Sequence, residues 1–164
     1  MVTSPQFAKL KQMTLLSGDS KSVAAPWFYF NLQELFMIKS IAHASFLVAD
    51  LATSLKFYCD VLQIPLNPNR PKFAYDGAWL DLDNKQQLHL MVLPNPDSTD
   101  GRPEHGGRDR HVALLVEDLE ALAERLEQAG VEFSRSKSGR AAFFCRDPDG
   151  NALEFAEDFT PTIK

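Results

Sequence analysis

The chain has 164 residues, of which 45% are hydrophobic and 24% are charged. This length suits one compact domain or two small, tightly packed modules, and the apolar content excludes a disordered chain. With 17 basic and 22 acidic residues, the net charge of −5 and the pI of about 5.3 exclude the basic surface typical of nucleic-acid-binding domains.

The sequence predicts a cytoplasmic protein that binds neither a membrane nor nucleic acid. No segment approaches the roughly 18–20 uninterrupted apolar residues that a membrane span needs. The two cysteines, Cys59 and Cys145, lack the spacing of a metal or redox motif, so we interpret them as reduced thiols.

Residues 1–36 differ from the rest of the chain because they show no sustained helical or strand periodicity. Three interpretations stay open. The segment is an extension that is disordered or packs on the domain, or it is a functional arm. Alternatively, the start of the protein is mis-assigned and Met37 is the true first residue.

An internal repeat organises the remainder of the chain. His43 is followed by Val, Asp and Leu five, seven and eight residues later, and His111 is followed by the same three residue types at the same distances. Such self-similarity predicts two copies of one supersecondary unit.

The elements expected in each copy follow the same order. In the first, Asp50 caps a helix that presents Leu51, Leu55, Tyr58 and Leu62, and strands follow at 72–75, 78–82 and 87–93. In the second, Asp118 caps a helix that ends at Gly130, and strands follow at 131–134, 141–145 and 152–156.

We therefore predict an α+β fold in which two tandem βαβββ modules pack into a curved mixed sheet around a metal site. The predicted boundaries are an extension at 1–36, a first module at 37–99, a linker at 100–109, a second module at 110–158 and a tail at 159–164.

Strand alternation places one potential metal ligand on the first and last strands of each module. These residues are His43, His89, His111 and Glu154, each on a small or apolar face. Imidazole and carboxylate donors suit one divalent Ni, Zn, Co, Mn or Fe(II) ion per site. His105 lies in a glycine-rich loop, where we expect a solvated or lid residue.

Four segments give the chain a family resemblance: Ile41-Ala42-His43, residues 57–62, Gly77-Ala78-Trp79-Leu80, and residues 147–151 leading to Leu153-Glu154. Residues 37–158 resemble the vicinal oxygen chelate superfamily, which includes glyoxalases, bleomycin resistance proteins and extradiol dioxygenases. The resemblance implies that His43, His111 and Glu154 are core metal ligands. It places His89 at the fourth position, which is Glu in typical glyoxalase I and Gln in the epimerase. Gln63 replaces a glycine that usually ends the first helix.

This resemblance implies a metal-dependent, glyoxalase-like lyase or isomerase whose small substrate chelates the metal through vicinal oxygens. Glu154 would move a proton between two substrate carbons, and Ser45 and Arg110 are candidate substrate contacts. Glutathione or another thiol is a candidate co-substrate. The alternatives are a fosfomycin-type thiol transferase, a dioxygenase, and a metal-free binding protein of the bleomycin-resistance type. We expect a homodimer, with each site either within one chain or shared between two.

Overall fold

The computed structural model describes residues 37–83, 85–97 and 100–158. Residues 40–158 belong to one compact unit, and 37–39 belong to a separate N-terminal unit that ends at Lys39. The predictions for residues 1–36 and 159–164 lie outside the described residues. None of the helices within the described ranges has the length and apolar character that a membrane crossing requires.

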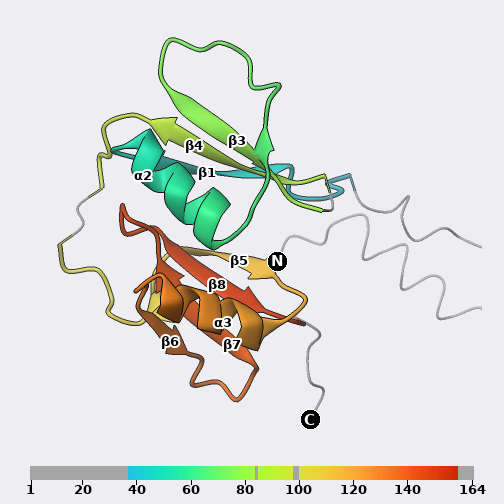
Figure 1. Cartoon of the computed structure of the whole chain (residues 1–164), viewed down its shortest axis with the longest axis vertical. Helices are drawn as coiled ribbons and strands as arrows, with labels where there is room; N and C mark the ends of the chain where they lie inside the picture. Colours follow the sequence, from blue (N-terminus) through green and yellow to red (C-terminus); the bar gives the residue numbers. More distant parts are fainter. Residues whose placement is uncertain (1–36, 84, 98–99, 159–164) are drawn as a thin grey trace, which may run out of the picture. The chain divides into compact units, whose positions relative to one another are not determined.

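Two four-stranded mixed sheets with the same internal order form the fold (Figure 1). The first is ordered β1 (His43–Val48), β4 (Gln87–Val92), β3 (Gly77–Asp81) and β2 (Leu66–Asn67). The second is ordered β5 (His111–Leu115), β8 (Ala152–Ala156), β7 (Ala142–Arg146) and β6 (Phe133–Arg135). In each sheet the first and last strands of the module run parallel, and the other neighbours run antiparallel. The prediction of two βαβββ modules is confirmed.

The helix of the first module begins at the predicted cap. The side chain of Asp50 accepts a hydrogen bond from the Thr53 amide at 2.7 Å, and α2 (Leu51–Leu55) follows. The chain then widens into a π-helical segment, η2 (Lys56–Val61), which buries Tyr58 completely. Gln63, at the expected glycine position, has φ of 57°, a conformation that favours glycine.

The helix of the second module, α3 (Leu119–Gln128), also follows its predicted boundaries. The carboxylate of Asp118 accepts from the Ala121 amide at 2.9 Å. Gly130 ends the helix with φ of 69°, as the left-handed C-cap requires.

One predicted strand is wrong. Residues 72–75 are irregular, and β2 lies earlier in the chain, at Leu66–Asn67. In the loop that replaces it, the Arg70 guanidinium donates to the Tyr75 carbonyl at 2.9 Å and lies 4.9 Å from the Phe73 ring centroid. These local contacts favour a folded loop over an extended strand.

A shared hydrophobic core and a set of hydrogen bonds join the two modules. The Tyr58 hydroxyl donates to Asp147 Oδ2 at 2.8 Å. The Ala49 amide donates to Asp149 Oδ1 at 2.8 Å, and Asn151 Nδ2 donates to the Leu47 carbonyl at 3.2 Å. The side chains that the strands direct into this core include Phe46, Leu90, Leu153 and Phe155. Because side chains alternate along a strand, the residues next to these lie on the opposite face of each sheet.

Candidate functional site

The open face of the first sheet carries a stack of aromatic rings. His43 and His89 stack with their ring centroids 4.1 Å apart and their planes 12° from parallel. Trp79, directly opposite His89 on β3, covers the other side of that ring at 4.5 Å and 10°. Burial, together with the nearby charges of His43 and Arg70, lowers the pKa of His89. The structure therefore brings the two predicted ligands of the first module together.

The second module pairs its own two predicted ligands. His111 Nε2 lies 3.0 Å from Glu154 Oε2, and the other ring nitrogen of His111, Nδ1, lies 2.8 Å from the Asp109 carbonyl oxygen. That carbonyl can only accept, so Nδ1 carries the proton and Nε2 faces the carboxylate. Glu154 is 4% exposed on β8, on the same face as Ala152 and Ala156.

Glu154 also has a charged neighbour, Arg140. Arg140 Nη2 donates to Glu154 Oε1 at 3.1 Å, so the two carboxylate oxygens have different partners. Arg140 is therefore an ion-pair partner of the predicted catalytic carboxylate. A buried glutamate needs an opposite charge nearby, and the Arg140 guanidinium supplies part of that charge.

The four predicted ligands form two pairs and not one cluster. Among the residues that the structure describes, no group of three or more His, Cys, Asp or Glu side chains could hold a metal ion. One pair belongs to each module, so a four-ligand centre needs the open faces of two modules to meet.

The second pair nevertheless fits a metal ion in its chemistry and spacing. Ligand atoms about 2.1 Å from an ion and at right angles to each other lie about 3.0 Å apart, which is the separation of His111 Nε2 and Glu154 Oε2. A hydrogen bond from the second ring nitrogen to a carbonyl is typical of metal-binding histidines. The parallel rings of His43 and His89 must tilt before both lone pairs can point at one ion.

Asp109 anchors the backbone that orients His111. Its carboxylate accepts from Arg102 Nε at 2.8 Å and lies 2.9 Å from Arg146 Nη1. Burial would raise the pKa of Asp109, but the hydrogen bonds from Arg102, Arg146 and the Arg110 amide lower it to about 2. No sequence motif predicts this cluster, and Arg146 lies 37 residues from Asp109.

The two predicted substrate contacts lie beside His111. A cavity of about 270 Å³ is lined by Ser45 from β1 and by Arg110 and His111 from the start of β5. Arg110 forms an ion pair with Asp97 at 2.8 Å, and both side chains are largely exposed. The structure thus brings Ser45, Arg110 and one predicted metal ligand to one cavity.

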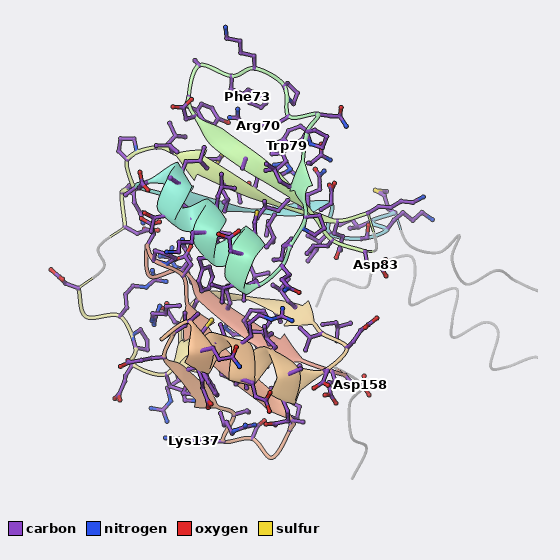
Figure 2. All side chains as sticks on the ribbon, viewed as in Figure 1. Arg70, Phe73, Trp79, Asp83, Lys137 and Asp158 are labelled. Atoms are coloured by element: carbon purple, nitrogen blue, oxygen red, sulfur yellow. The ribbon has the colours of Figure 1, made fainter. Side chains whose placement is uncertain are left out.

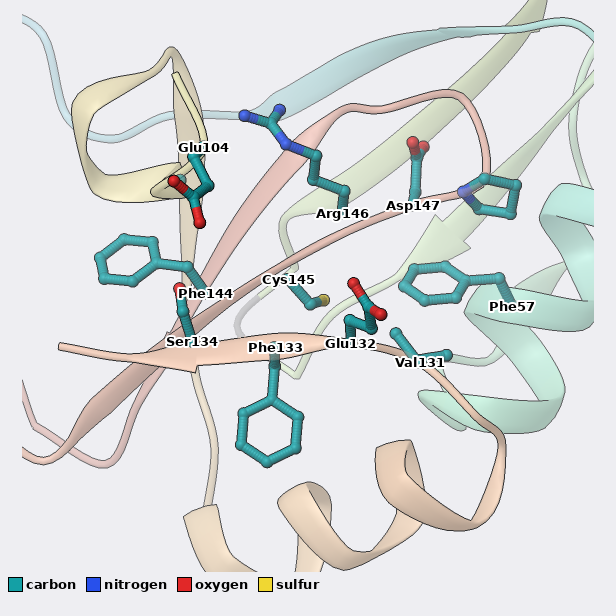
Figure 3. A pocket seen from close by; sticks show the side chains of 12 residues that line it. Phe57, Glu104, Val131, Glu132, Phe133, Ser134, Phe144, Cys145, Arg146 and Asp147 are labelled. Atoms are coloured by element: carbon teal, nitrogen blue, oxygen red, sulfur yellow. The ribbon is translucent and has the colours of Figure 1, made fainter. Parts of the chain in front are cut away.

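A larger cavity of about 510 Å³ opens at β6 and β7 (Figure 3). Phe57, Glu104, Phe144 and Arg146 are among its lining residues, and none of the four predicted ligands lines it. We place the candidate site beside the smaller cavity, because His111, which is paired with Glu154, lines it together with the two predicted substrate contacts.

His105 differs from its prediction. Its ring centroid lies 4.9 Å from that of Phe144, and its Nδ1 accepts from the Gly107 amide at 3.1 Å. Its Nε2 is buried without a hydrogen-bond partner among the described residues, so the expectation of a solvated ring is wrong for this atom.

A row of polar side chains continues from His89 across the first sheet, and sequence reasoning also missed it. Gln87 Oε1 lies 3.0 Å from His89 Nε2, Gln87 Nε2 lies 2.7 Å from Asp81 Oδ1, and Asn67 Nδ2 lies 2.8 Å from that same oxygen. Strand alternation could have placed Gln87 and His89 on one face. Beyond Trp79 lie Phe73 and Arg70, which Figure 2 shows in the loop above this sheet.

Comparison with known proteins agrees with this architecture. Residues 40–155 match the model of the Glyoxalase/Bleomycin resistance protein/Dioxygenase superfamily. The chain is 32% identical to a lactoylglutathione lyase of Haemophilus influenzae, over 72% of this chain and 92% of that protein. It is also 32% identical to the glutathione transferase FosA of Serratia marcescens, over 72% and 80%.

Among solved structures, the glyoxylase/bleomycin resistance protein/dioxygenase domain from Frankia sp. EAN1pec is 25% identical, with a TM-score of 0.56 over 72% of this chain and 96% of that one. The repeated sheet order and the family match over most of the chain point to the same family. This chain belongs to the Glyoxalase/Bleomycin resistance protein/Dioxygenase superfamily.

Proposed function

We propose that this protein is a metal-dependent, glyoxalase-like lyase or isomerase whose small substrate binds through adjacent oxygens. The observation that carries the proposal is the 3.0 Å approach of His111 Nε2 to Glu154 Oε2, with the tautomer of His111 fixed by the Asp109 carbonyl. The lactoylglutathione lyase relative supports the reaction type, and glutathione or a related thiol is the proposed co-substrate.

A divalent ion at this site would polarise the substrate oxygens and stabilise the negative charge that develops on them. The protein's own contribution is proton transfer. Glu154, displaced from the ion, would accept a proton at Oε2 from one substrate carbon and return it to the neighbouring carbon, while the substrate's hydroxyl proton moves to its carbonyl oxygen, so the substrate is isomerised with no net change in atoms. Arg140, bound to Oε1, holds the carboxylate in position during this transfer.

We propose further that two chains share each site, with His43 and His89 from one chain and His111 and Glu154 from the other. The support is that the first strand of each module exposes its ligand candidate. His43 and Ser45 on β1 are exposed, as are His111 and Ala113 on β5. Leu115 continues the second face and is 65% exposed.

Metal analysis tests the function. The full chain, purified without a tag and offered Ni, Zn, Mn, Co and Fe(II) separately, should retain about one ion per chain, and His111→Ala should lose it. The loaded protein should then isomerise the hemithioacetal of methylglyoxal and glutathione. Metal binding with activity on fosfomycin and thiol alone would favour the transferase alternative, since the FosA relative is as similar as the lyase. A chain that retains none of these ions is not a metal-dependent enzyme.

A further inference from the structure

Four side chains on the open face of the first sheet form one continuous hydrogen-bonded row. The Asp81 carboxylate accepts from Asn67 Nδ2 at 2.8 and 3.0 Å and from Gln87 Nε2 at 2.7 Å. At the other end of the same amide, Gln87 Oε1 lies 3.0 Å from His89 Nε2. These residues come from β2, β3 and β4, so the row crosses the sheet to reach the metal-ligand candidate.

The carboxylate determines which way the Gln87 amide points. The hydrogen bonds from Asn67 and Gln87 lower the pKa of Asp81, so it remains ionised and can only accept. If the amide were reversed, its oxygen would face the carboxylate and its NH₂ group would face His89. The observed orientation gives Asp81 two donors and leaves Gln87 Oε1 as an acceptor for the histidine.

This orientation selects one tautomer of His89. Because Gln87 Oε1 can only accept, His89 Nε2 carries the proton and the lone pair of the neutral ring is on Nδ1. The stacked rings of Trp79 and His43 cover the two faces of the imidazole, so rotation of the ring would break the stack as well as the hydrogen bond.

We propose that Asn67, Asp81 and Gln87 are positioning residues that fix the tautomer of His89, so that His89 presents Nδ1 to the metal ion. This inference rests on the proposed metal site. The two modules then orient their histidines in opposite senses: the Asp109 carbonyl holds Nδ1 of His111 and directs its Nε2 at Glu154, whereas Gln87 holds Nε2 of His89 and leaves its Nδ1 available. A hydrogen-bonded group behind a ligand histidine typically changes metal affinity by about 10- to 100-fold.

The first measurement uses the metal-free full chain. Nitrogen-15 NMR of the imidazole rings at pH 8, with His89→Gln to assign the signal, should show His89 protonated at Nε2. In Gln87→Leu this preference should decrease, while His111 keeps its own tautomer. An Nδ1-protonated His89 in the parent chain would overturn the proposal, whether or not the protein binds a metal.

The second measurement compares Zn²⁺ and Co²⁺ affinities by competition with a chelator. Gln87→Leu should bind each ion about 10- to 100-fold more weakly. Gln86→Leu is the matched control, because Gln86 donates instead to the Ile41 carbonyl, and it should stay within about twofold of the parent. The double variant Gln87→Glu with Asp81→Asn moves the carboxylate to position 87 and the amide to position 81. Position 87 still offers an acceptor to His89, so the affinity for both ions should return toward that of the parent.

The two proposals fail in different ways. If the parent chain binds neither ion, the proposed function is wrong, and the NMR measurement still decides whether the row fixes the tautomer. If the parent binds the ions and Gln87→Leu binds them equally well, the positioning role is wrong and the proposed function stands.

Discussion

The hydroxyl of Tyr58 donates a 2.8 Å hydrogen bond to Asp147 Oδ2, joining the π-helical segment of the first module to the turn before β8 in the second. Both residues are buried. Burial raises the pKa of Asp147 despite the hydrogen bonds from Asn151 and Tyr58. The ionised form of the Asp147 carboxyl group is therefore stabilised by these hydrogen-bond donors.

Removal of the Tyr58 hydroxyl should destabilise the protein. Tyr58→Phe keeps the ring packing and deprives a buried carboxylate of one donor, so we expect the free energy of unfolding to fall by about 1–3 kcal/mol. Urea unfolding followed by circular dichroism measures the change. Tyr75→Phe serves as a control, because the Tyr75 hydroxyl donates to the Met91 sulfur, a weak acceptor, at 3.7 Å. Equal stability of Tyr58→Phe and the parent would show that this hydrogen bond contributes nothing.

A mixed dimer tests whether two chains share each site. One variant combines His43→Ala with His89→Ala, and the other combines His111→Ala with Glu154→Ala. With shared sites, a heterodimer of the two variants has one intact set of four ligands and one empty set, so it should retain one ion.

Two differently tagged chains, coexpressed and purified through both tags, give this heterodimer for elemental analysis. Each variant homodimer is the control and should retain no ion. A metal-free heterodimer would place all four ligands within one chain.

Metal binding should change the fluorescence of Trp79. His43 and His89 must leave their parallel stack to direct both lone pairs at one ion, and Trp79 is stacked on His89. Titration of the Trp27→Phe variant with Zn²⁺ should therefore shift the Trp79 emission with the same midpoint as metal uptake. The signal should be absent in Trp79→Phe. Metal uptake with unchanged emission would argue against any movement of the stack.

Acid should weaken the contribution of Asp109 to stability. Its pKa is about 2 in the folded protein and 3.8 ordinarily, so the unfolded chain takes up the proton first as the pH falls. The contribution is complete above about pH 4 and is lost as the pH approaches 2. In urea unfolding of the metal-free protein, the stability difference between the parent and Asp109→Asn should shrink across this window. A constant difference from pH 5 to pH 2 would contradict the assigned pKa.

A glycine at position 63 should stabilise the first module. Gln63 has φ of 57° and an exposed side chain, and a left-handed backbone costs a non-glycine residue roughly 1–2 kcal/mol. The greater flexibility of glycine in the unfolded chain offsets part of this gain, so Gln63→Gly should add about 0.5–1 kcal/mol. Thermal unfolding tests the change, and Gln63→Ala should not reproduce it.

The sequence predicted the features that depend on local pattern. The alternation in β8 separates Glu154 from Leu153 and Phe155, and both helix caps follow from an aspartate before an apolar repeat. The predicted strand at 72–75 is wrong because Phe73 and Tyr75 alternate as a strand would, but their rings pack with Arg70 in a loop.

The contacts between distant residues could not be predicted in this way. Arg102 and Arg146 meet Asp109 only after the second module has folded, and Asp81 reaches His89 only through Gln87. Strand alternation places Gln87 and His89 on one face, but the other contacts depend on strand register and on the packing of a loop, which no spacing rule in one sequence encodes. For the same reason, the sequence identified four ligand candidates without revealing that they separate into two pairs.

The alternation of β8 also limits how this scaffold can change. Because Leu153 and Phe155 support the core while Glu154 lies on the opposite face, a one-residue insertion in the preceding turn would exchange the two faces of the strand. The carboxylate would enter the core and the aromatic ring would leave it. New chemistry in such a scaffold therefore arises by substitution at alternate strand positions. Insertions and deletions are confined to loops that do not set the register of a strand such as β8.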